Sequence, residues 1–284
     1  MKPVGISEQL MYTTVRLTAD NGSCGTGYFY NYRFGETVVP VILTNKHVVN
    51  NNPDETVTFL LHLTKDGESA EGNYSVKLNT HWIFHPTKDL CFTYCAAVDN
   101  QIPVLTGKKV FKRPIENDLI WTREQLKELS MSESVVMVGY PNGLWDQNHN
   151  FPIFRYGHTA AHPGYDFNED GIGLVDIACF PGSSGSPVFI VNEGSVRDKQ
   201  GTMAIGQSRI VFLGTLFAGP TINAEGKIGV KNIPTGTQEI ISNTQMMMNL
   251  GYYIKSYELE AFRSIIESDL TREMIPPTED EEKE

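Results

Sequence analysis

Cysteine is scarce in this chain, which carries only Cys24, Cys91, Cys95 and Cys179 among its 284 residues. So few cysteines cannot build the dense disulfide framework of a small secreted domain. Their spacing also lacks the CxxC or paired-histidine pattern of a zinc site. We therefore expect reduced, mostly buried thiols, and we expect neither a metal nor another cofactor.

Long apolar runs are missing as well. No stretch approaches the roughly 18 uninterrupted apolar residues that a membrane-spanning helix needs. The N-terminal segment Met1–Glu8 lacks the apolar region that a signal peptide carries. The sequence therefore predicts no membrane partner, and together with the scarce cysteines it favours a cytoplasmic location.

Basic residues are outnumbered by acidic ones, with 23 Lys and Arg against 34 Asp and Glu and a formal net charge of −11. Surfaces that bind nucleic acid or anionic membranes need clustered Lys and Arg, so we predict no nucleic-acid partner. Part of the acidity lies in residues 278–284, after Pro276 and Pro277. Such a segment is typical of a solvated, disordered tail.

The hydrophobic pattern is mostly that of β-strands. Short runs rich in β-branched and aromatic residues, bounded by turn residues, occupy 11–17, 27–32, 38–43, 57–63, 90–98, 135–138, 172–177, 187–191, 210–217 and 251–254. Helices are predicted only over 122–129 and 257–268. Many short strands with few helices favour a sandwich or barrels over a parallel βαβ sheet, with a boundary near 105–130.

Ser184 stands in a glycine- and serine-rich turn directly before an apolar run. Gly182 and Gly185 let the backbone turn tightly, so that the Ser184 hydroxyl projects outward and nearby N–H groups converge. The amides of Gly182 and Ser184 would then form an oxyanion hole for a tetrahedral intermediate. Taken alone, the segment also fits a plain turn, because short motifs have false positives.

Two other residues have the chemistry to activate a serine hydroxyl, which is a weak nucleophile until a base takes its proton. His47 follows an apolar run that ends at Leu43 and stands in a polar turn beside valines. Asp89 enters an apolar run, where an unpaired carboxylate is costly to bury. We predict His47 as general base and Asp89 as the group that orients its ring. A turn-capping role stays the alternative for Asp89.

The chain order of these residues, His47 then Asp89 then Ser184, matches one of the known triad orders, that of chymotrypsin. Five segments resemble those of trypsin-like (chymotrypsin-fold) serine peptidases, closest in style to bacterial stand-alone members with HtrA- or V8-like motifs. The segments are Gly25–Phe29, Thr44–Val48, His85–Leu90, Val138–Pro141 and Gly182–Pro187. Val48 stands where vertebrate-type members have a cysteine, so Cys24 cannot form their disulfide here.

This resemblance implies an all-β fold of two six-stranded antiparallel barrels with a C-terminal helix. It implies an N-terminal barrel over 1–115 that carries His47 and Asp89. A C-terminal barrel with the terminal helix, over 116–270, would carry Ser184. The acidic disordered tail would occupy 271–284, and no PDZ domain is expected.

The resemblance also implies where the primary specificity pocket lies. Its wall would include Ala178, Phe217, Ala218 and Gly219. A charged pocket selects the opposite charge on the substrate, and Ala178 offers none. We therefore expect cleavage after a neutral, small or apolar residue.

The expected function is that of a serine-type endopeptidase acting on protein or peptide substrates. Two alternatives stay open: a catalytically silent binding module on the same fold, and a latent protease whose loop 180–183 orders only when an activating protein partner binds. An esterase of the α/β-hydrolase type is disfavoured, because the serine motif precedes an expected strand and follows His47 and Asp89 in the chain.

Overall fold

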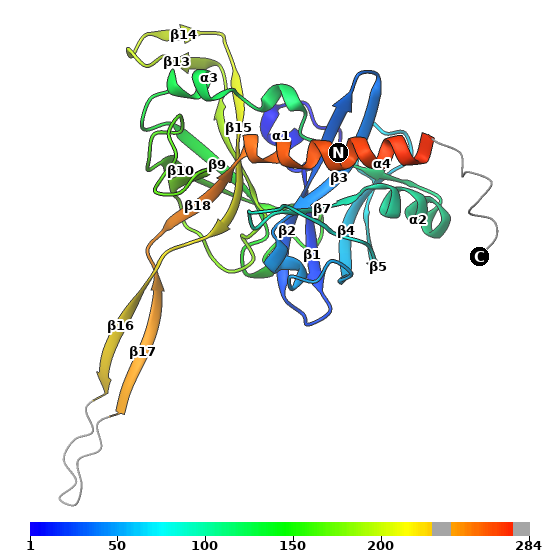
Figure 1. The fold of residues 1–284 in the computed structure, drawn as a ribbon, viewed down its shortest axis with the longest axis horizontal. Helices are drawn as coiled ribbons and strands as arrows, with labels where there is room; N and C mark the ends of the chain where they lie inside the picture. Colours follow the sequence, from blue (N-terminus) through cyan, green and yellow to red (C-terminus); the bar gives the residue numbers. More distant parts are fainter. Residues whose placement is uncertain (229–239, 275–284) are drawn as a thin grey trace, which may run out of the picture.

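The computed structural model describes residues 1–228 and 240–274. Strands dominate this part of the chain, and short helices lie between them (Figure 1). The mostly β composition predicted from the sequence is confirmed. Most of the predicted acidic tail falls outside the described residues.

The N-terminal half forms one eight-stranded sheet with the order β5-β4-β1-β2-β3-β7-β6, and β8 pairs with β4. Its elements are α1 (Ile6–Leu10), β1 (Thr14–Ala19), β2 (Cys24–Phe34), β3 (Thr37–Thr44), η1 (Lys46–Val49), β4 (Thr56–Thr64), β5 (Asn73–Asn79), β6 (Ile83–Phe84), β7 (Cys91–Tyr94), α2 (Ala96–Thr106) and β8 (Lys109–Phe111). The pairing order does not return to its start, so the expected closed six-stranded N-terminal barrel is not confirmed.

Helix α2 is a second difference from the prediction. The sequence predicts a strand over 90–98, but β7 ends at Tyr94 and the chain turns into the helix. Val98 and Ile102 then pack into the core beneath the sheet. Buried apolar positions four residues apart fit one helix face, and this tertiary packing overrides the strand-like local composition.

The C-terminal half contains a closed barrel with the strand order β10-β11-β18-β15-β12-β9. Its elements are η2 (Asn117–Leu119), α3 (Arg123–Lys127), β9 (Ser134–Gly139), η3 (Pro141–Gly143), β10 (Ile153–Thr159), β11 (Ile172–Asp176), β12 (Pro187–Asn192), β13 (Ser195–Arg197), β14 (Met203–Ile205), β15 (Arg209–Ala218), β16 (Thr221–Ile228), β17 (Ile240–Met247) and β18 (Leu250–Lys255). This barrel confirms one of the two expected barrels.

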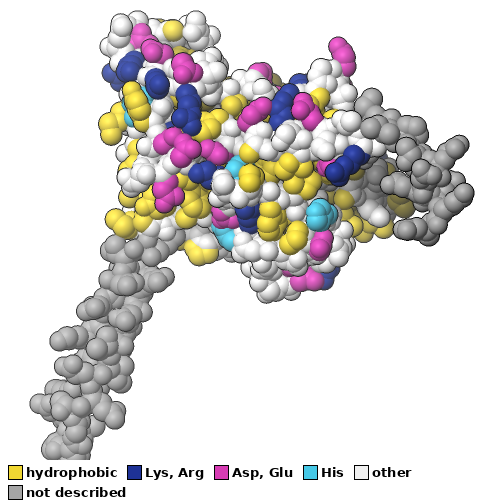
Figure 2. All heavy atoms as spheres, in the orientation of Figure 1, with side chains coloured by type: hydrophobic (Ala, Val, Ile, Leu, Met, Phe, Trp, Pro, Cys, Tyr) yellow, Lys and Arg dark blue, Asp and Glu magenta, His cyan; other side chains and the backbone are white. Residues whose placement is uncertain are grey.

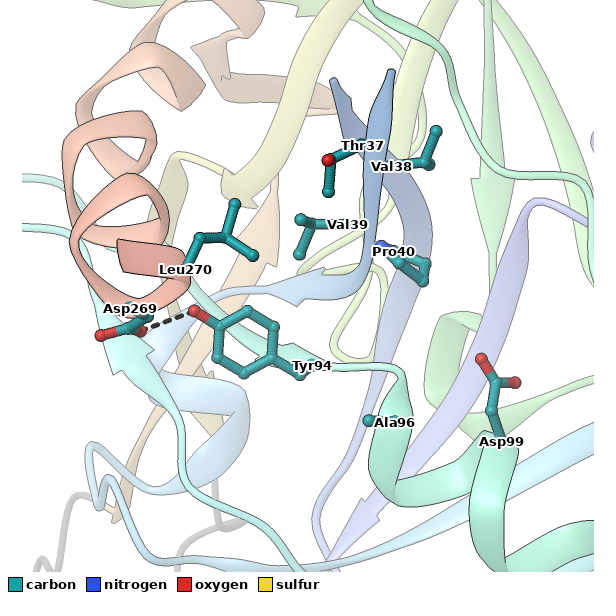
Figure 3. Close-up of a pocket in the computed structure, with 9 residues that line it drawn as sticks. All are labelled: Thr37, Val38, Val39, Pro40, Tyr94, Ala96, Asp99, Asp269 and Leu270. Carbon is teal, nitrogen blue, oxygen red and sulfur yellow. Dashed lines mark hydrogen bonds between the residues drawn. The ribbon is translucent and has the colours of Figure 1, made fainter. Parts of the chain in front are cut away.

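The chain ends its described part in η4 (Ser256–Phe262) and α4 (Arg263–Met274), which contain the predicted helix 257–268. The helix runs from the barrel across to the N-terminal sheet (Figure 1). The Tyr32 hydroxyl donates to Leu259 O at 2.9 Å, and the Phe262 ring lies 4.9 Å from that of Phe92. Figure 3 shows Tyr94 donating to Asp269 beside a hollow of about 440 Å³ between α4, β3 and α2. The C-terminal helix therefore ties the two halves together.

A two-stranded hairpin of β16 and β17 projects from the body (Figure 1). Its pairing runs from Thr221 opposite Met247 to Ile228 opposite Ile240. The sequence analysis predicts no strands here, because polar residues interrupt every short apolar run of the segment. The hairpin starts just beyond β15, the strand that carries part of the expected specificity wall.

The charged side chains and the cysteines are arranged as the amino-acid composition leads one to expect. Basic and acidic side chains intermingle on the face shown in Figure 2. The four cysteines are free, and three of them are buried. Among the described helices, none has the length and apolar character needed to cross a membrane.

His62 makes the stability of this fold depend on pH. The side chain is buried beside the ring of Tyr12, and burial lowers its pKa to about 4. An unfolded histidine titrates near pH 6.5, so between about pH 6.5 and 4 the unfolded chain binds a proton that the folded chain excludes. This contribution to stability is complete above about pH 6.5 and is lost as the pH falls through about 4.

We therefore expect the unfolding free energy of His62→Phe to fall less than that of the wild type as the pH decreases. Between pH 7 and 4, the wild type should lose about 2–3 kcal/mol more unfolding free energy than the variant. Urea denaturation at a series of pH values measures this difference. The exposed His158, changed to Phe, serves as control and should leave the profile unchanged. Parallel wild-type and His62→Phe curves would refute the assignment.

Candidate active site

His47 and Asp89 are brought together at the end of β3. The strand ends at Thr44, and the chain then turns into the short η1 helix that carries His47. His47 Nδ1 lies 2.5 Å from Asp89 Oδ2, and the His47 backbone N–H donates to Asp89 Oδ1 at 3.2 Å. One carboxylate thus holds both the ring and the backbone of the histidine. His47 Nε2 has no hydrogen-bond partner among the described residues and is free to meet a substrate or a serine hydroxyl.

The loop that presents Asp89 is organised by His85. This ring is 2% exposed, and its Nδ1 accepts from the backbone N–H groups of Thr87 and Lys88 at 3.2 and 2.9 Å. Its Nε2 lies 3.2 Å from Glu258 O and donates to it, which fixes the neutral tautomer. Burial lowers the pKa of His85, in keeping with a neutral ring. His85 is therefore a positioning residue whose role the sequence analysis misses.

The loop 180–184, in which the sequence predicts an oxyanion hole, has two fixed peptide planes. Pro181 O accepts from the Asn142 N–H at 2.5 Å, and Ser183 O accepts from the Ser186 N–H at 3.0 Å. In a trans peptide the next N–H points opposite to the carbonyl, so the amides of Gly182 and Ser184 point away from these bonds. Neither amide has an acceptor within the described part of the chain. Unused N–H donors of this kind are what an oxyanion hole requires.

Thr26 joins the Ser184 turn to the N-terminal sheet. Its backbone N–H donates to Ser184 O at 2.9 Å, and its Oγ1 donates to Gly182 O at 3.1 Å. Its carbonyl accepts from Thr44 Oγ1 at 2.8 Å, three residues before His47. These bonds therefore connect Ser184, in the C-terminal half, to β2 and through it to the end of β3, which leads into His47. The sequence signal for Thr26 is its place between two glycines, which leaves room for a close backbone approach.

Two of the four residues expected at the specificity pocket line one hollow, and the other two do not. Phe217 and Ala218 line a hollow of about 380 Å³ together with residues of the 167–172 segment and Tyr252. Ala178 and Gly219 do not line that hollow. Next to Ala178, the Cys179 thiol lies against Gly251, as does Leu216. Burial raises the pKa of Cys179 to about 12, so the thiol stays protonated and neutral.

A sequence profile of the trypsin-like peptidase domain matches residues 25–197, which is more than half of the chain. The chain therefore belongs to the trypsin-like peptidase domain family. The matched range includes His47, Asp89 and Ser184. A comparison with curated proteins finds no significant match.

Solved structures with a similar course of the chain share little sequence. A mutant of Rv3671c from M. tuberculosis, in an inactive form, is 13% identical with a TM-score of 0.42, over 94% of this chain and 98% of that chain. The Rv3671c protease in an inactive form is 15% identical with a TM-score of 0.42, over 90% of each chain. An inactivated protease paralogue of the scabies mite is 12% identical with a TM-score of 0.45, over 93% and 97%.

The packing around Gly185 generates a stability prediction. Gly185 has φ +83°, and an added Cβ would stand 1.9 Å from Thr26 O. We expect Gly185→Ala to lower the unfolding free energy by about 2–5 kcal/mol, from left-handed strain plus overpacking. Gly194 has a similar φ of +77° and open space around it, so Gly194→Ala should cost only about 1–2 kcal/mol. Denaturant unfolding compares the two, and equal losses would contradict the close contact with Thr26.

Proposed function

We propose that this member of the trypsin-like peptidase family is a serine-type endopeptidase with Ser184, His47 and Asp89 as its catalytic triad. The observation that carries the proposal is the pairing of His47 Nδ1 with Asp89 at 2.5 Å, which leaves Nε2 unpartnered in the described structure. A histidine held in this tautomer can accept a proton on Nε2. We also propose that 1–115 supplies His47 and Asp89, and that 116–270 supplies Ser184.

The proposed reaction runs through an acyl-enzyme. Ser184 Oγ attacks the peptide carbonyl carbon while His47 Nε2 takes the hydroxyl proton, and Asp89 stabilises the resulting imidazolium. The carbonyl oxygen becomes an oxyanion that accepts from the Gly182 and Ser184 amides. His47 then gives its proton to the leaving amine, and the C–N bond breaks. A water molecule, deprotonated by His47, then attacks the ester carbonyl. The bond between the carbonyl carbon and Ser184 Oγ breaks, His47 returns the proton to Oγ, and the carboxylic product leaves.

The hydrogen bonds of the oxyanion loop favour constitutive activity over latency. A latent enzyme would hold the Pro181–Gly182 peptide turned, with its carbonyl toward the substrate. Here Asn142 holds Pro181 O, and Thr26 holds Gly182 O. Turning the loop would break these bonds, each of which contributes about 1 kcal/mol. An activating protein partner is therefore not needed in this proposal.

Labelling with a fluorophosphonate probe tests the nucleophile in the isolated protein. We expect the wild type to be modified at Ser184, as located by mass spectrometry. Ser184→Ala and His47→Ala should stay folded and lose peptide hydrolysis by on the order of 10⁴-fold or more. Ser208→Ala, at an exposed position, should keep both labelling and turnover. Unchanged hydrolysis by Ser184→Ala would refute the triad, and an unlabelled wild type would favour latency.

For the residue before the cleaved bond, we propose a neutral, small or apolar side chain. The support is that Ala178, Phe217 and Ala218 are neutral and that the Cys179 thiol stays protonated. Glu169, which lines the same hollow as Phe217 and Ala218, disfavours an acidic side chain there. A peptide library varied at that position should give its highest kcat/KM for uncharged residues. A clear preference for Lys or Arg would contradict the proposal. So would a preference for Glu, which would point to Arg155, whose guanidinium lies 4.8 Å over the Phe180 ring.

A further inference from the structure

Arg16 projects from β1 toward the proposed catalytic centre. Its register partner is Thr26, the residue whose amide holds Ser184 O. Side chains directly opposite in an antiparallel pair share one face of the sheet. Arg16 Nη2 lies 3.0 Å from Cys24 Sγ and 3.3 Å from where a Cβ on Gly143 would stand.

Gly143 connects this guanidinium to the oxyanion loop. The Gly143 backbone nitrogen lies 3.2 Å from where a Cβ on Gly182 would stand. One backbone segment, η3, thus separates the guanidinium from an amide of the proposed oxyanion hole. A charge so close to the reacting bond acts on any substrate that occupies the site.

The charge of Arg16 has no carboxylate partner in the described structure. Nη1 donates to Thr18 Oγ1 at 3.1 Å, and the guanidinium carbon lies 4.2 Å over the Trp145 ring. No Asp or Glu oxygen of the described residues lies within 4 Å of it, and its buried Nε has no hydrogen-bond partner there. Nη1 and Nη2 each keep one further N–H beyond their bonds to Thr18 and Cys24. A planar guanidinium that is stacked on an aromatic ring and has these donors left is preorganised to bind a carboxylate.

The position of Arg16 assigns it to one side of the scissile bond. The proposed specificity wall, with Ala178 and Phe217, comes from the barrel segments around β11 and β15 and would take the acyl part of the substrate. Arg16, Cys24 and Trp145 come instead from β1, β2 and the chain after η3. None of these three residues lines the hollow beside Phe217 and Ala218. We therefore place them at the other end of the proposed site, where the leaving amine and the residues attached to it would lie.

We propose that Arg16 binds a carboxylate of the substrate on the leaving-group side of Ser184, which makes it a specificity-determining residue. This inference rests on the proposed endopeptidase function. The carboxylate has two sources with the same chemistry: an Asp or Glu side chain within two residues after the cleaved bond, or the terminal carboxylate of a short substrate. In either case the ligand is an anionic peptide segment.

Synthetic fluorogenic peptides that differ only at the second residue after the cleaved bond test the inference. We expect Glu to exceed Gln by about tenfold in kcat/KM, and Lys to be the poorest. Added salt should narrow the difference, because the guanidinium is partly exposed. A second pair of peptides ends at that residue with a free carboxylate or an amide, and a preference for the free carboxylate would identify the chain terminus as the source.

Substitutions of Arg16 show whether the preference originates there. Arg16→Gln should make the Glu and Gln peptides equivalent, whereas Arg16→Lys should retain part of the preference. Arg113→Gln is the matched control, because that arginine stacks on Phe111 and also has no carboxylate partner among the described residues. It should keep the wild-type preference. No preference in the wild type, or an undiminished preference in folded Arg16→Gln, would overturn the proposal.

A binding measurement separates this inference from the proposed function. The Ser184→Ala protein is titrated with the Glu and Gln peptides, and tryptophan fluorescence reports binding because Trp145 lies against Arg16. We expect the Glu peptide to bind about tenfold more tightly, and Arg16→Gln to abolish that difference. If the wild type hydrolyses no peptide but the Glu peptide still binds more tightly than the Gln peptide, the endopeptidase proposal fails and the proposed carboxylate site at Arg16 stands. Equal binding of both peptides would overturn the site alone.

Discussion

The candidate site depends on one connection, the hydrogen bonds that Thr26 makes between the two halves of the chain. Its N–H, Oγ1 and C=O reach Ser184 O, Gly182 O and Thr44 Oγ1 respectively. Thr26 itself is buried, and a buried polar group left without its bond costs more than a made bond contributes. Loop 180–184 and the strand leading to His47 therefore cannot shift independently. The C-terminal helical segment joins the two halves at a second place, through Leu259 and Phe262.

A second constraint is the hydrogen-bond network that fixes the orientation of the polar groups of the site. His85 accepts two amides and keeps the loop that carries Asp89 in place, and Asp89 accepts both N–H groups of His47. The bonds to Pro181 O and Ser183 O aim the amides of Gly182 and Ser184 without using them. Preorganisation of this kind means that donors need not reorient during a reaction.

The sequence supports prediction best where local chemistry decides the outcome. Runs rich in β-branched and aromatic residues predict β4, β12 and β18 closely, because such side chains fit the pleated surface of a strand. Helix α2 and the β16–β17 hairpin escape prediction. The first depends on packing against a sheet assembled from distant segments, and the second on cross-strand pairing without a strong apolar pattern. Whether the N-terminal strands close into a barrel is likewise decided by pairing between strands far apart in sequence.

By itself, the sequence determined the residue types and their order: a histidine after one strand, an aspartate before another, and a serine between glycines, with a mostly β chain around them. The tertiary structure alone decided which side chains meet. The 2.5 Å pairing of His47 with Asp89, the aim of the Gly182 and Ser184 amides and the approach of Arg16 to η3 all join segments far apart in the chain. Such contacts depend on strand register and on the packing of the two halves, which no local pattern specifies.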